Sequence, residues 1–211
     1  STLSSSSAAS DVYKRQIKTC TYIIAPVMMS TAFCAEPLVR LILTEKWLPC
    51  VLFLRVFCLG YVCWPIITAN LNAAKAVGRS DLYLKCQLLN EGVCILLLLA
   101  TFRVSVEAIA YGMLITNIVT QILDAQLNKK LIGYGYLEQM RDILPTLLLA
   151  AGAGLCMYLV IFLHLPDLLA VIIQVVVGLG IYLTGSAILE LDTFEYFKDV
   201  LAPSIRQKLK R

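Results

Sequence analysis

The chain has 211 residues, of which 59% are hydrophobic and 15% are charged, and its formal net charge is +4. Water-soluble domains carry about 45–50% apolar and about 25% charged residues, and one of this size has too little interior to bury more apolar surface. The composition therefore excludes a soluble globular domain, a disordered chain and a nucleic-acid binder with a dense basic surface. It favours an all-α protein that crosses a membrane several times.

A helix needs about 20 predominantly apolar residues to cross a hydrocarbon core of about 30 Å. We expect six such transmembrane helices in a bundle over residues 17–190, at 17–43, 48–69, 84–101, 106–127, 143–163 and 168–189. The first is long, and Pro26 and Glu36-Pro37 interrupt it, so we expect a kinked or tilted helix followed by a short further element. Barrel strands would show about ten alternating residues each, and no segment has that pattern.

The two ends of the chain differ from the apolar segments. Residues 1–16 include four consecutive serines, and we expect them to form a disordered or non-native tail. Residues 191–211 combine an apolar face with a basic one, which predicts an amphipathic helix on an anionic cytoplasmic leaflet. A solvated tail is the alternative. The apolar face holds Leu191, Phe194, Phe197, Leu201, Ile205 and Leu209, and the basic face holds Lys198, Arg206, Lys208 and Lys210.

The basic residues predict an orientation. Fourteen of the 18 Lys and Arg residues lie in the segments before the first span, between spans two and three, between spans four and five, or after span six, if Lys18 and Lys85 at the adjoining span ends are included. The three opposite connections hold only Arg40, Lys46 and Arg103. Loops rich in Lys and Arg stay on the cytoplasmic side. We therefore expect both termini in the cytoplasm.

Ionisable residues within spans usually face a cavity or a partner. Arg55 lies about 10 Å below the outer interface at 1.5 Å per residue, so it either snorkels, forms a structural ion pair, or presents a fixed positive charge to an anionic substrate. Glu91 lies in span three, where a carboxylate is suited to ion coupling. The sequence alone does not decide whether Arg55 and Glu91 have a structural or a functional role.

Span four carries a polar stripe. Asn117, Thr120, Gln121 and Asp124 recur at i, i+3, i+4 and i+7 and so share one helix face. That face must meet protein or water, because lipid offers amide groups no partner. Interhelical hydrogen bonding and a hydrophilic lumen are both compatible with the pattern. Our candidate lumen residues are Arg55, Asn117, Gln121 and Gln174, and Glu91 and Asp124 are candidates for ion coupling.

Other residues in the spans predict helix packing and no catalysis. Ala150 with Gly154, and Gly178 with Tyr182 and Gly185, have the spacing of close helix contacts. The sequence has no Gly-rich phosphate loop, GxSxG or HExxH motif, no CxxC pair and a single histidine. We therefore expect neither an enzyme active site nor a metal or other cofactor.

Several motifs occur in a familiar order. The segment 22–26 reads Tyr-Ile-Ile-Ala-Pro, 44–49 reads Thr-Glu-Lys-Trp-Leu-Pro, and 78–81 reads Gly-Arg-Ser-Asp. This order resembles the C-terminal half of bacterial Wzx-type polysaccharide flippases, which export O-antigen and exopolysaccharide units and belong to the superfamily of multidrug and oligosaccharidyl-lipid exporters. Family members commonly have a proline in the corresponding span, a Gly-x-Lys-Trp-like turn and a Gly-Arg-x-Asp-like loop. Thr44 stands where that turn often has Gly.

The resemblance implies one six-helix lobe of a two-lobed transporter that works by alternating access. The implied substrate is a lipid-linked oligosaccharide of the undecaprenyl-pyrophosphate type, and the implied location is the bacterial inner membrane. The implied partners are the bilayer and a second, N-terminal lobe, and no nucleic acid. The alternatives are a multidrug or cation antiporter of the same superfamily and a membrane scaffold subunit without transport activity.

Overall fold

A computed structural model describes residues 2–163, 165–196 and 198, with side chains from residue 11 onward. Every regular element in this part of the chain is helical, which confirms the all-α prediction. The long helices are α1 (Thr2–Phe33), α5 (Ser80–Thr101), α6 (Val106–Ile132), α7 (Tyr136–Leu159) and α8 (Asp167–Ile188). The shorter elements are α2 (Ala35–Leu43), η1 (Glu45–Cys50), α3 (Val51–Tyr61), α4 (Trp64–Ala76) and η2 (Val160–Leu163).

The helices form a membrane-spanning bundle. Four helices are long and apolar enough to cross a membrane, and there are six spans if each of two bent pairs counts as one. These pairs are α1 with α2, bent by 73°, and α3 with α4, bent by 40°. The six segments agree with the six expected from hydropathy, although α1, α6 and α7 extend beyond the predicted limits.

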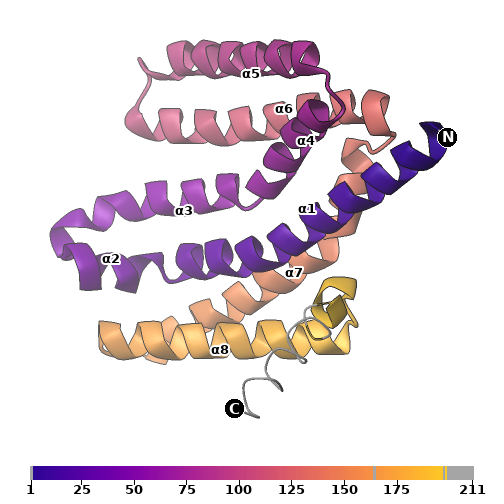
Figure 1. The fold of residues 1–211 in the computed structure, drawn as a ribbon. Coiled ribbons are helices and arrows are strands. Elements are labelled where there is room, and N and C mark those ends of the chain that lie inside the picture. Colours follow the sequence, from indigo (N-terminus) through magenta and orange to yellow (C-terminus); the bar gives the residue numbers. More distant parts are fainter. Residues whose placement is uncertain (1, 164, 197, 199–211) are drawn as a thin grey trace, which may run out of the picture.

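Figure 1 shows the order of the helices across the bundle: α5 and α6 lie at one side, α3 with α4 and then α1 follow, and α7 and α8 lie at the other side. Helix α1 is central, because it packs against α7, α3 and α4. Its Ile17 and Ala25 are almost fully buried, in two apolar clusters that also contain residues of α4, α7 and α8. Helix α5 is peripheral and has no buried residue.

The N-terminal prediction needs correction. The structure continues α1 back to Thr2, so the backbone of residues 2–16 forms one helix with the first span. Tyr13 packs on the apolar cluster that contains Ile17, and the Lys14 ammonium lies 5.2 Å from the centre of the Tyr134 ring. These contacts give the helical conformation a tertiary support that the serine-rich composition did not indicate.

The first span is interrupted beside Glu36-Pro37, one of the two predicted places, and not at Pro26. Helix α1 runs through Pro26, and the chain bends at Cys34, between α1 and α2. The predicted short further element is α2. At the end of α2, Thr44 has a φ of 78°, a left-handed conformation that is strained for a β-branched residue. A glycine at this position would adopt the same conformation without that strain.

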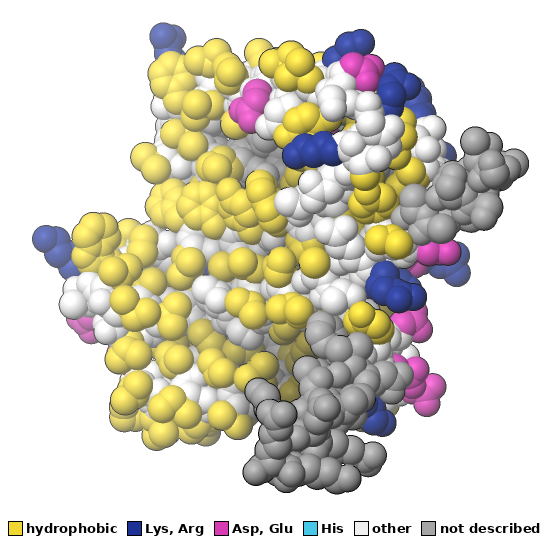
Figure 2. Space-filling model, viewed as in Figure 1, with side chains coloured by type: hydrophobic (Ala, Val, Ile, Leu, Met, Phe, Trp, Pro, Cys, Tyr) yellow, Lys and Arg dark blue, Asp and Glu magenta, His cyan; other side chains and the backbone are white. Residues whose placement is uncertain are grey.

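Charge and apolar surface are segregated. On the face shown in Figure 2, yellow apolar side chains cover most of the bundle, and Lys, Arg, Asp and Glu gather mainly at the end where the N-terminus lies. This end also holds the connections from α4 to α5 and from α6 to α7. The described part of the predicted C-terminal tail is a short helix at residues 192–196, and Leu191 and Phe194 pack against the bundle. Residues 199–211 lie outside the described residues.

Candidate functional site

A hollow of about 400 Å³ lies between α4, α5, α6 and the end of α3. Its wall combines two aromatic rings, three amides, one carboxylate and three hydroxyls with a few apolar side chains. The lining residues are Tyr61, Trp64, Ile67, Thr68, Leu71, Gln87, Asn90, Glu91, Cys94, Met113, Thr116, Asn117 and Thr120. Ligand sites typically place a few polar groups on an apolar and aromatic wall, so this hollow is our candidate site.

The break between α3 and α4 positions the aromatic rings. Helix α3 ends at Tyr61, and α4 starts at Trp64 with Pro65 in its first turn, where a proline needs no helical N–H partner. The Tyr61 and Trp64 rings lie 5.2 Å apart, tilted by 46°. The bend that interrupts the second span thus brings two rings together at one wall of the hollow.

Close approach of α3 and α6 places Asn117. A Cβ atom at Gly60 would lie 2.9 Å from Asn117 Nδ2, which is closer than real Cβ atoms come to other atoms. Because residue 60 is glycine, the amide of Asn117 lies directly against α3 and still lines the hollow.

Helix α5 supplies the remaining amides and the carboxylate. Gln87 Nε2 donates to Glu91 Oε1 at 3.1 Å, one helical turn away. Asn90 Nδ2 donates to Asp124 Oδ1 at 3.0 Å and so connects the hollow to α6. Asp124 is 1% exposed, and its Oδ2 is buried without a hydrogen-bond partner in the described part of the chain. A carboxylate with a free oxygen therefore lies directly beside the hollow.

The structure brings together three of the six residues that the sequence singled out. Asn117 and Glu91 line the hollow, and Asp124 reaches it through Asn90. Gln121 is buried on α6 but does not line the hollow. Arg55 and Gln174 lie elsewhere.

Arg55 supports the bend between α1 and α2. Its Nε donates to the carbonyl oxygen of Ala32 at 3.3 Å, in the last turn of α1, where carbonyls lack helical partners. No ion pair joins it to another described residue. Arg55 also lines a separate groove of about 290 Å³ with Ala32, Phe33, Leu59, Leu155 and Tyr158. One cation therefore sits in an otherwise mainly apolar groove.

Gln174 lies between α7 and α8. Its side chain is fully buried, and Nε2 donates to the carbonyl oxygen of Met157 at 3.2 Å. Its Oε1 is buried and has no partner among the described residues. These contacts fit interhelical hydrogen bonding, and they keep Gln174 apart from the hollow.

Sequence reasoning missed a buried amide cluster. Asn128 Nδ2 donates to Asn70 Oδ1 at 2.6 Å, and Gln139 Nε2 donates to the same oxygen at 2.9 Å. Asn70 Nδ2 in turn donates to Gln139 Oε1 at 3.0 Å, so the three amides join α4, α6 and α7. Asn128 follows Asp124 by four residues and therefore continues the polar stripe of span four, which was the available signal. The stripe has two roles: Asn117 and Thr120 line the hollow, whereas Asn128 joins α6 to α4.

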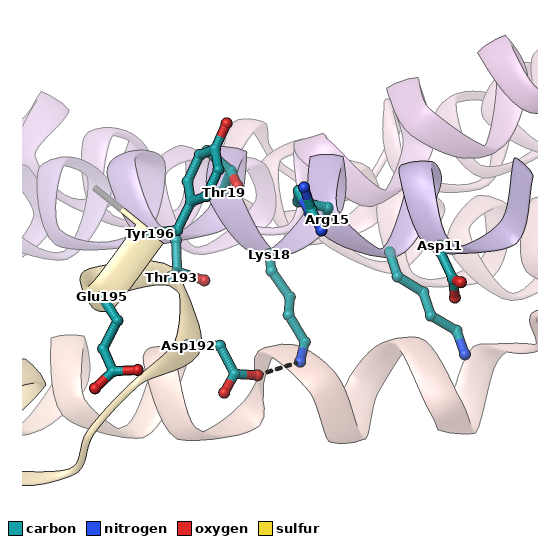
Figure 3. Close-up of a pocket in the computed structure, with 9 residues that line it drawn as sticks. Asp11, Arg15, Lys18, Thr19, Asp192, Thr193, Glu195 and Tyr196 are labelled. Carbon is teal, nitrogen blue, oxygen red and sulfur yellow. Dashed lines mark hydrogen bonds and ion pairs between the residues drawn. The ribbon is translucent and has the colours of Figure 1, made fainter. Parts of the chain in front are cut away.

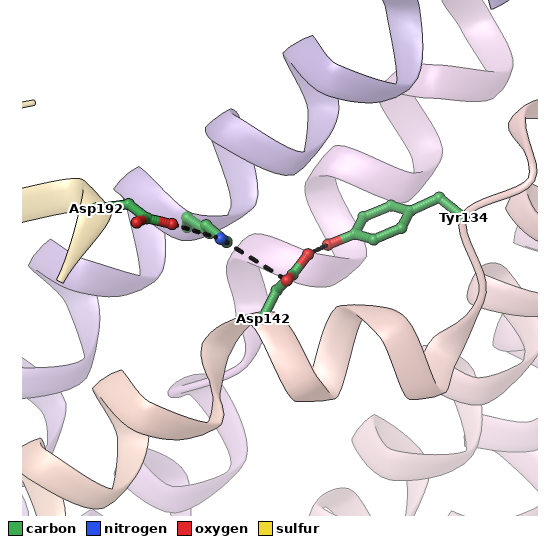
Figure 4. Close-up of polar contacts among 4 residues, drawn as sticks. Tyr134, Asp142 and Asp192 are labelled. Carbon is green, nitrogen blue, oxygen red and sulfur yellow. Dashed lines mark hydrogen bonds and ion pairs between the residues drawn. The ribbon is translucent and has the colours of Figure 1, made fainter. Parts of the chain in front are cut away.

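A second polar cluster closes the charged end of the bundle (Figure 4). Lys18 Nζ lies 3.1 Å from Asp192 Oδ2 and 3.7 Å from Asp142 Oδ1. The hydroxyl of Tyr134 donates to Asp142 Oδ2 at 2.8 Å. Burial and this bond to a carboxylate raise the pKa of Tyr134 above its ordinary value. The cluster ties α1 to α7 and to the short helix after α8.

The loop after α4 has the expected motif in an ordered form. Gly78 has a φ of 75°, the left-handed conformation that ends a helix and that glycine adopts at low cost. Arg79 donates from Nε and Nη2 to the two carboxylate oxygens of Asp81, at 3.0 and 3.1 Å. The hydrogen bonding and charge of Asp81 raise the pKa of Arg79.

Comparison with known proteins bears on one part of the chain. A family model described as a polysaccharide biosynthesis protein matches residues 2–52. No curated protein and no solved structure matches the chain. The matched segment covers α1, α2, η1 and the start of α3, so it includes residues 2–16, which the sequence suggested were not native. The hollow, whose lining begins at Tyr61, lies beyond the match.

The match and the fold together describe an apolar, multi-pass helical protein with a segment typical of polysaccharide biosynthesis proteins. In the described part of the chain, no three His, Cys, Asp or Glu side chains come together as a metal site would need. The hollow offers amides, hydroxyls, one carboxylate and aromatic faces for binding.

Proposed function

We propose that the chain forms one lobe of a transporter that moves a lipid-linked oligosaccharide across the bacterial inner membrane. The match of residues 2–52 to a polysaccharide biosynthesis family carries this proposal, because it covers the central helix α1 and the bend that follows it. The spanning bundle supports it, since the hydrophilic head of such a substrate cannot cross hydrocarbon without a polar path. Alternating access would come from rocking of this lobe against a second one.

The hollow offers a plausible chemistry for that head. Amide and carboxylate groups exchange hydrogen bonds with sugar hydroxyls, and aromatic rings cover the apolar faces of sugar rings. We assign the sugar contacts to Asn117, Gln87 and the Tyr61–Trp64 pair, all of which line the hollow. Asp124, with its buried free oxygen, is our first candidate for ion coupling, and Glu91 is the second.

Arg55 is suited to a different part of the same substrate. Its groove has walls of Phe33, Leu59 and Leu155, so it offers a cation beside apolar surface. A pyrophosphate that carries a polyprenyl chain has the complementary character. Gln121 and Gln174 are buried, and they would reach substrate only if the helices moved apart during transport.

The charged end of the bundle sets the proposed orientation. We place this end, with both termini, in the cytoplasm, because its connections hold most of the basic residues. The basic residues 191–211 would then meet the anionic leaflet.

A drug or cation antiporter of the same superfamily is the second candidate. Glu91 shares the hollow with Tyr61 and Trp64, and a carboxylate beside aromatic faces attracts organic cations. Arg55, which would repel cations, lines a separate groove and so does not count against this candidate. A membrane scaffold without transport activity is the third candidate.

Deletion and re-expression of the reading frame that encodes the chain would separate these candidates. For a polysaccharide transporter, deletion removes surface polysaccharide and re-expression restores it, and Arg55→Ala reduces the recovery. For an antiporter, surface polysaccharide is unchanged and Glu91→Gln abolishes drug export. For a scaffold, neither Arg55→Ala nor Glu91→Gln changes the transport of any compound.

A further inference from the structure

Two adjoining hollows lie at the charged end of α1, away from the candidate site. The first, of about 530 Å³, is lined by three cations, three carboxylates and three hydroxyls (Figure 3): Lys14, Arg15, Lys18, Asp11, Asp192, Glu195, Thr19, Thr193 and Tyr196. The second, of about 540 Å³, has a mainly apolar wall to which Val12 and Cys20 contribute. Because Asp11, Arg15, Thr19 and Tyr196 line both, a charged space opens directly into an apolar one.

The charges of the first hollow are only partly paired. Lys18 forms ion pairs with Asp192 and Asp142. Arg15 and Lys14 lie against aromatic rings, at 5.6 Å from Tyr196 and 5.2 Å from Tyr134, and neither has a carboxylate partner in the described part of the chain. The carboxylates of Asp11 and Glu195 also lack a cationic partner there. Two cations and two anions around one space therefore remain open to a ligand.

The apolar hollow continues into the spanning part of the chain. Val12, Ile23 and Val27 are exposed, and their spacing of 11 and four residues places them on one face of α1. This face runs from the hollow along α1 in the direction of the membrane interior. A ligand with its head in the charged hollow could lay apolar chains along it.

We propose that the two hollows bind a membrane phospholipid with a phosphoethanolamine headgroup. The phosphate lies at Arg15 and Lys14, the ammonium lies at Glu195, and the acyl chains follow Val12 and Ile23. Guanidinium–phosphate and ammonium–carboxylate contacts are the strong, charge-assisted kind of hydrogen bond. A choline headgroup has no N–H to donate, and a glycerol headgroup brings only negative charge beside two carboxylates. The proposal does not depend on what the bundle transports.

Melting of the detergent-solubilised protein with added lipids tests the choice of headgroup. The lipids are phosphatidylethanolamine, its mono- and dimethyl forms, phosphatidylcholine and phosphatidylglycerol, all with the same acyl chains. We expect the largest rise in melting temperature with phosphatidylethanolamine and a stepwise decrease as methyl groups replace N–H donors. Equal rises with the ethanolamine and choline lipids, or a larger rise with phosphatidylglycerol, would overturn the proposal.

Variants test the assigned residues. Arg15→Gln and Glu195→Gln each remove one charge-assisted contact, so each should weaken phosphatidylethanolamine binding roughly tenfold. The matched control is Arg103→Gln, because Arg103 lies in the connection between α5 and α6, at the opposite end of the bundle. Binding by both hollow variants as tight as that of the unchanged protein contradicts the proposal. Glu195 is exposed, so its variant is expected to fold, and the lipid series on the unchanged protein needs no variant.

Discussion

At the scale of single residues, the helix through Pro26 depends on a distant hydroxyl. Proline has no N–H, so the carbonyl oxygen of Tyr22, four residues earlier, loses its helical donor. The hydroxyl of Tyr182 on α8 donates to that oxygen at 2.8 Å. The two tyrosine rings also lie 5.2 Å apart. A contact 160 residues away in the sequence thus replaces the missing helical bond and lets α1 continue to Phe33.

This account predicts coupling between the two positions. Tyr182→Phe leaves a buried carbonyl unpaired and should lower the free energy of unfolding by about 1–3 kcal/mol. In a Pro26→Ala background, the new N–H of residue 26 donates to the carbonyl oxygen of Tyr22. Tyr182→Phe should then lower the free energy of unfolding by clearly less. Unfolding of the single and double variants in mixed micelles measures both values. Equal costs of Tyr182→Phe in the two backgrounds would show that its hydroxyl does not replace the proline's missing donor.

Thr44 carries the clearest backbone strain in the described chain outside glycine. Its φ of 78° is costly for a β-branched residue, by about 1–3 kcal/mol, and glycine adopts it freely. Thr44→Gly should therefore raise the melting temperature. Thr31→Gly is the matched control, because Thr31 lies within α1, where glycine weakens a helix. A lower melting temperature for Thr44→Gly would contradict the strain.

At the scale of elements, the spans were predictable and their bends only in part. Hydropathy located the four long apolar helices and the two bent pairs, since each span must match the same membrane thickness. The bend of the first span depends on tertiary contacts: Tyr182 keeps α1 helical at Pro26, and Arg55 bonds the Ala32 carbonyl where the helix ends. Such contacts join residues far apart in the sequence, so the local signals at Pro26 and at Glu36-Pro37 could not show which of the two ends the helix.

The candidate site was predictable to a similar degree. The period of the stripe placed Asn117 and Asp124 on one face of α6, and both lie at or beside the hollow. The aromatic pair was not predicted, because it depends on the break between α3 and α4. Nor could the period separate the residues that line the hollow from Asn128, which bonds Asn70 on another helix.

Small residues set the spacing between helices, as their sequence pattern indicated. A Cβ atom at Gly154 on α7 would overlap the Phe33 ring of α1, whereas one at Gly152 would meet nothing within 4 Å. Gly154→Ala should therefore force α1 from α7 and lower the free energy of unfolding by about 1–3 kcal/mol, the usual cost of overpacking. Gly152→Ala should have no such effect, since it fills open space. Similar unfolding curves for the two variants would contradict this packing.

At the scale of the whole molecule, four long apolar helices, two bent pairs and one charged end predict a topology. A fluorescent protein that folds only in the cytoplasm should be fluorescent when it is fused after Gly78 or Gly133, because both loops lie at the charged end. A fusion after Arg103 should instead give active alkaline phosphatase, which folds only outside the cytoplasm. Phosphatase activity at Gly78 or Gly133 would contradict the proposed orientation. If fusions after Gly78 and after Arg103 gave the same pattern of fluorescence and phosphatase activity, α5 would not cross the membrane.

The bundle consists of two groups of helices that differ in how they pack. Helices α1, α7 and α8 pack through small residues and apolar clusters, whereas α4, α5 and α6 enclose the hollow. Helix α5 lies at the edge of the bundle and packs mainly on α6, so fewer helices hold it than hold α1. We therefore expect the hollow to open on the α5 side when it receives a substrate head.

The most direct test of the proposed function is movement of a lipid-linked oligosaccharide in vesicles that contain the two-lobed transporter of which the chain forms one lobe. An added glycosidase that cannot enter the vesicles measures how fast the oligosaccharide reaches the outer leaflet. We predict movement faster than in protein-free vesicles, a roughly tenfold loss for Asn117→Ala in the hollow, and no loss for Thr184→Ala, which is exposed on α8. Movement no faster than in protein-free vesicles, or an Asn117→Ala variant as fast as the unchanged protein, would contradict the account.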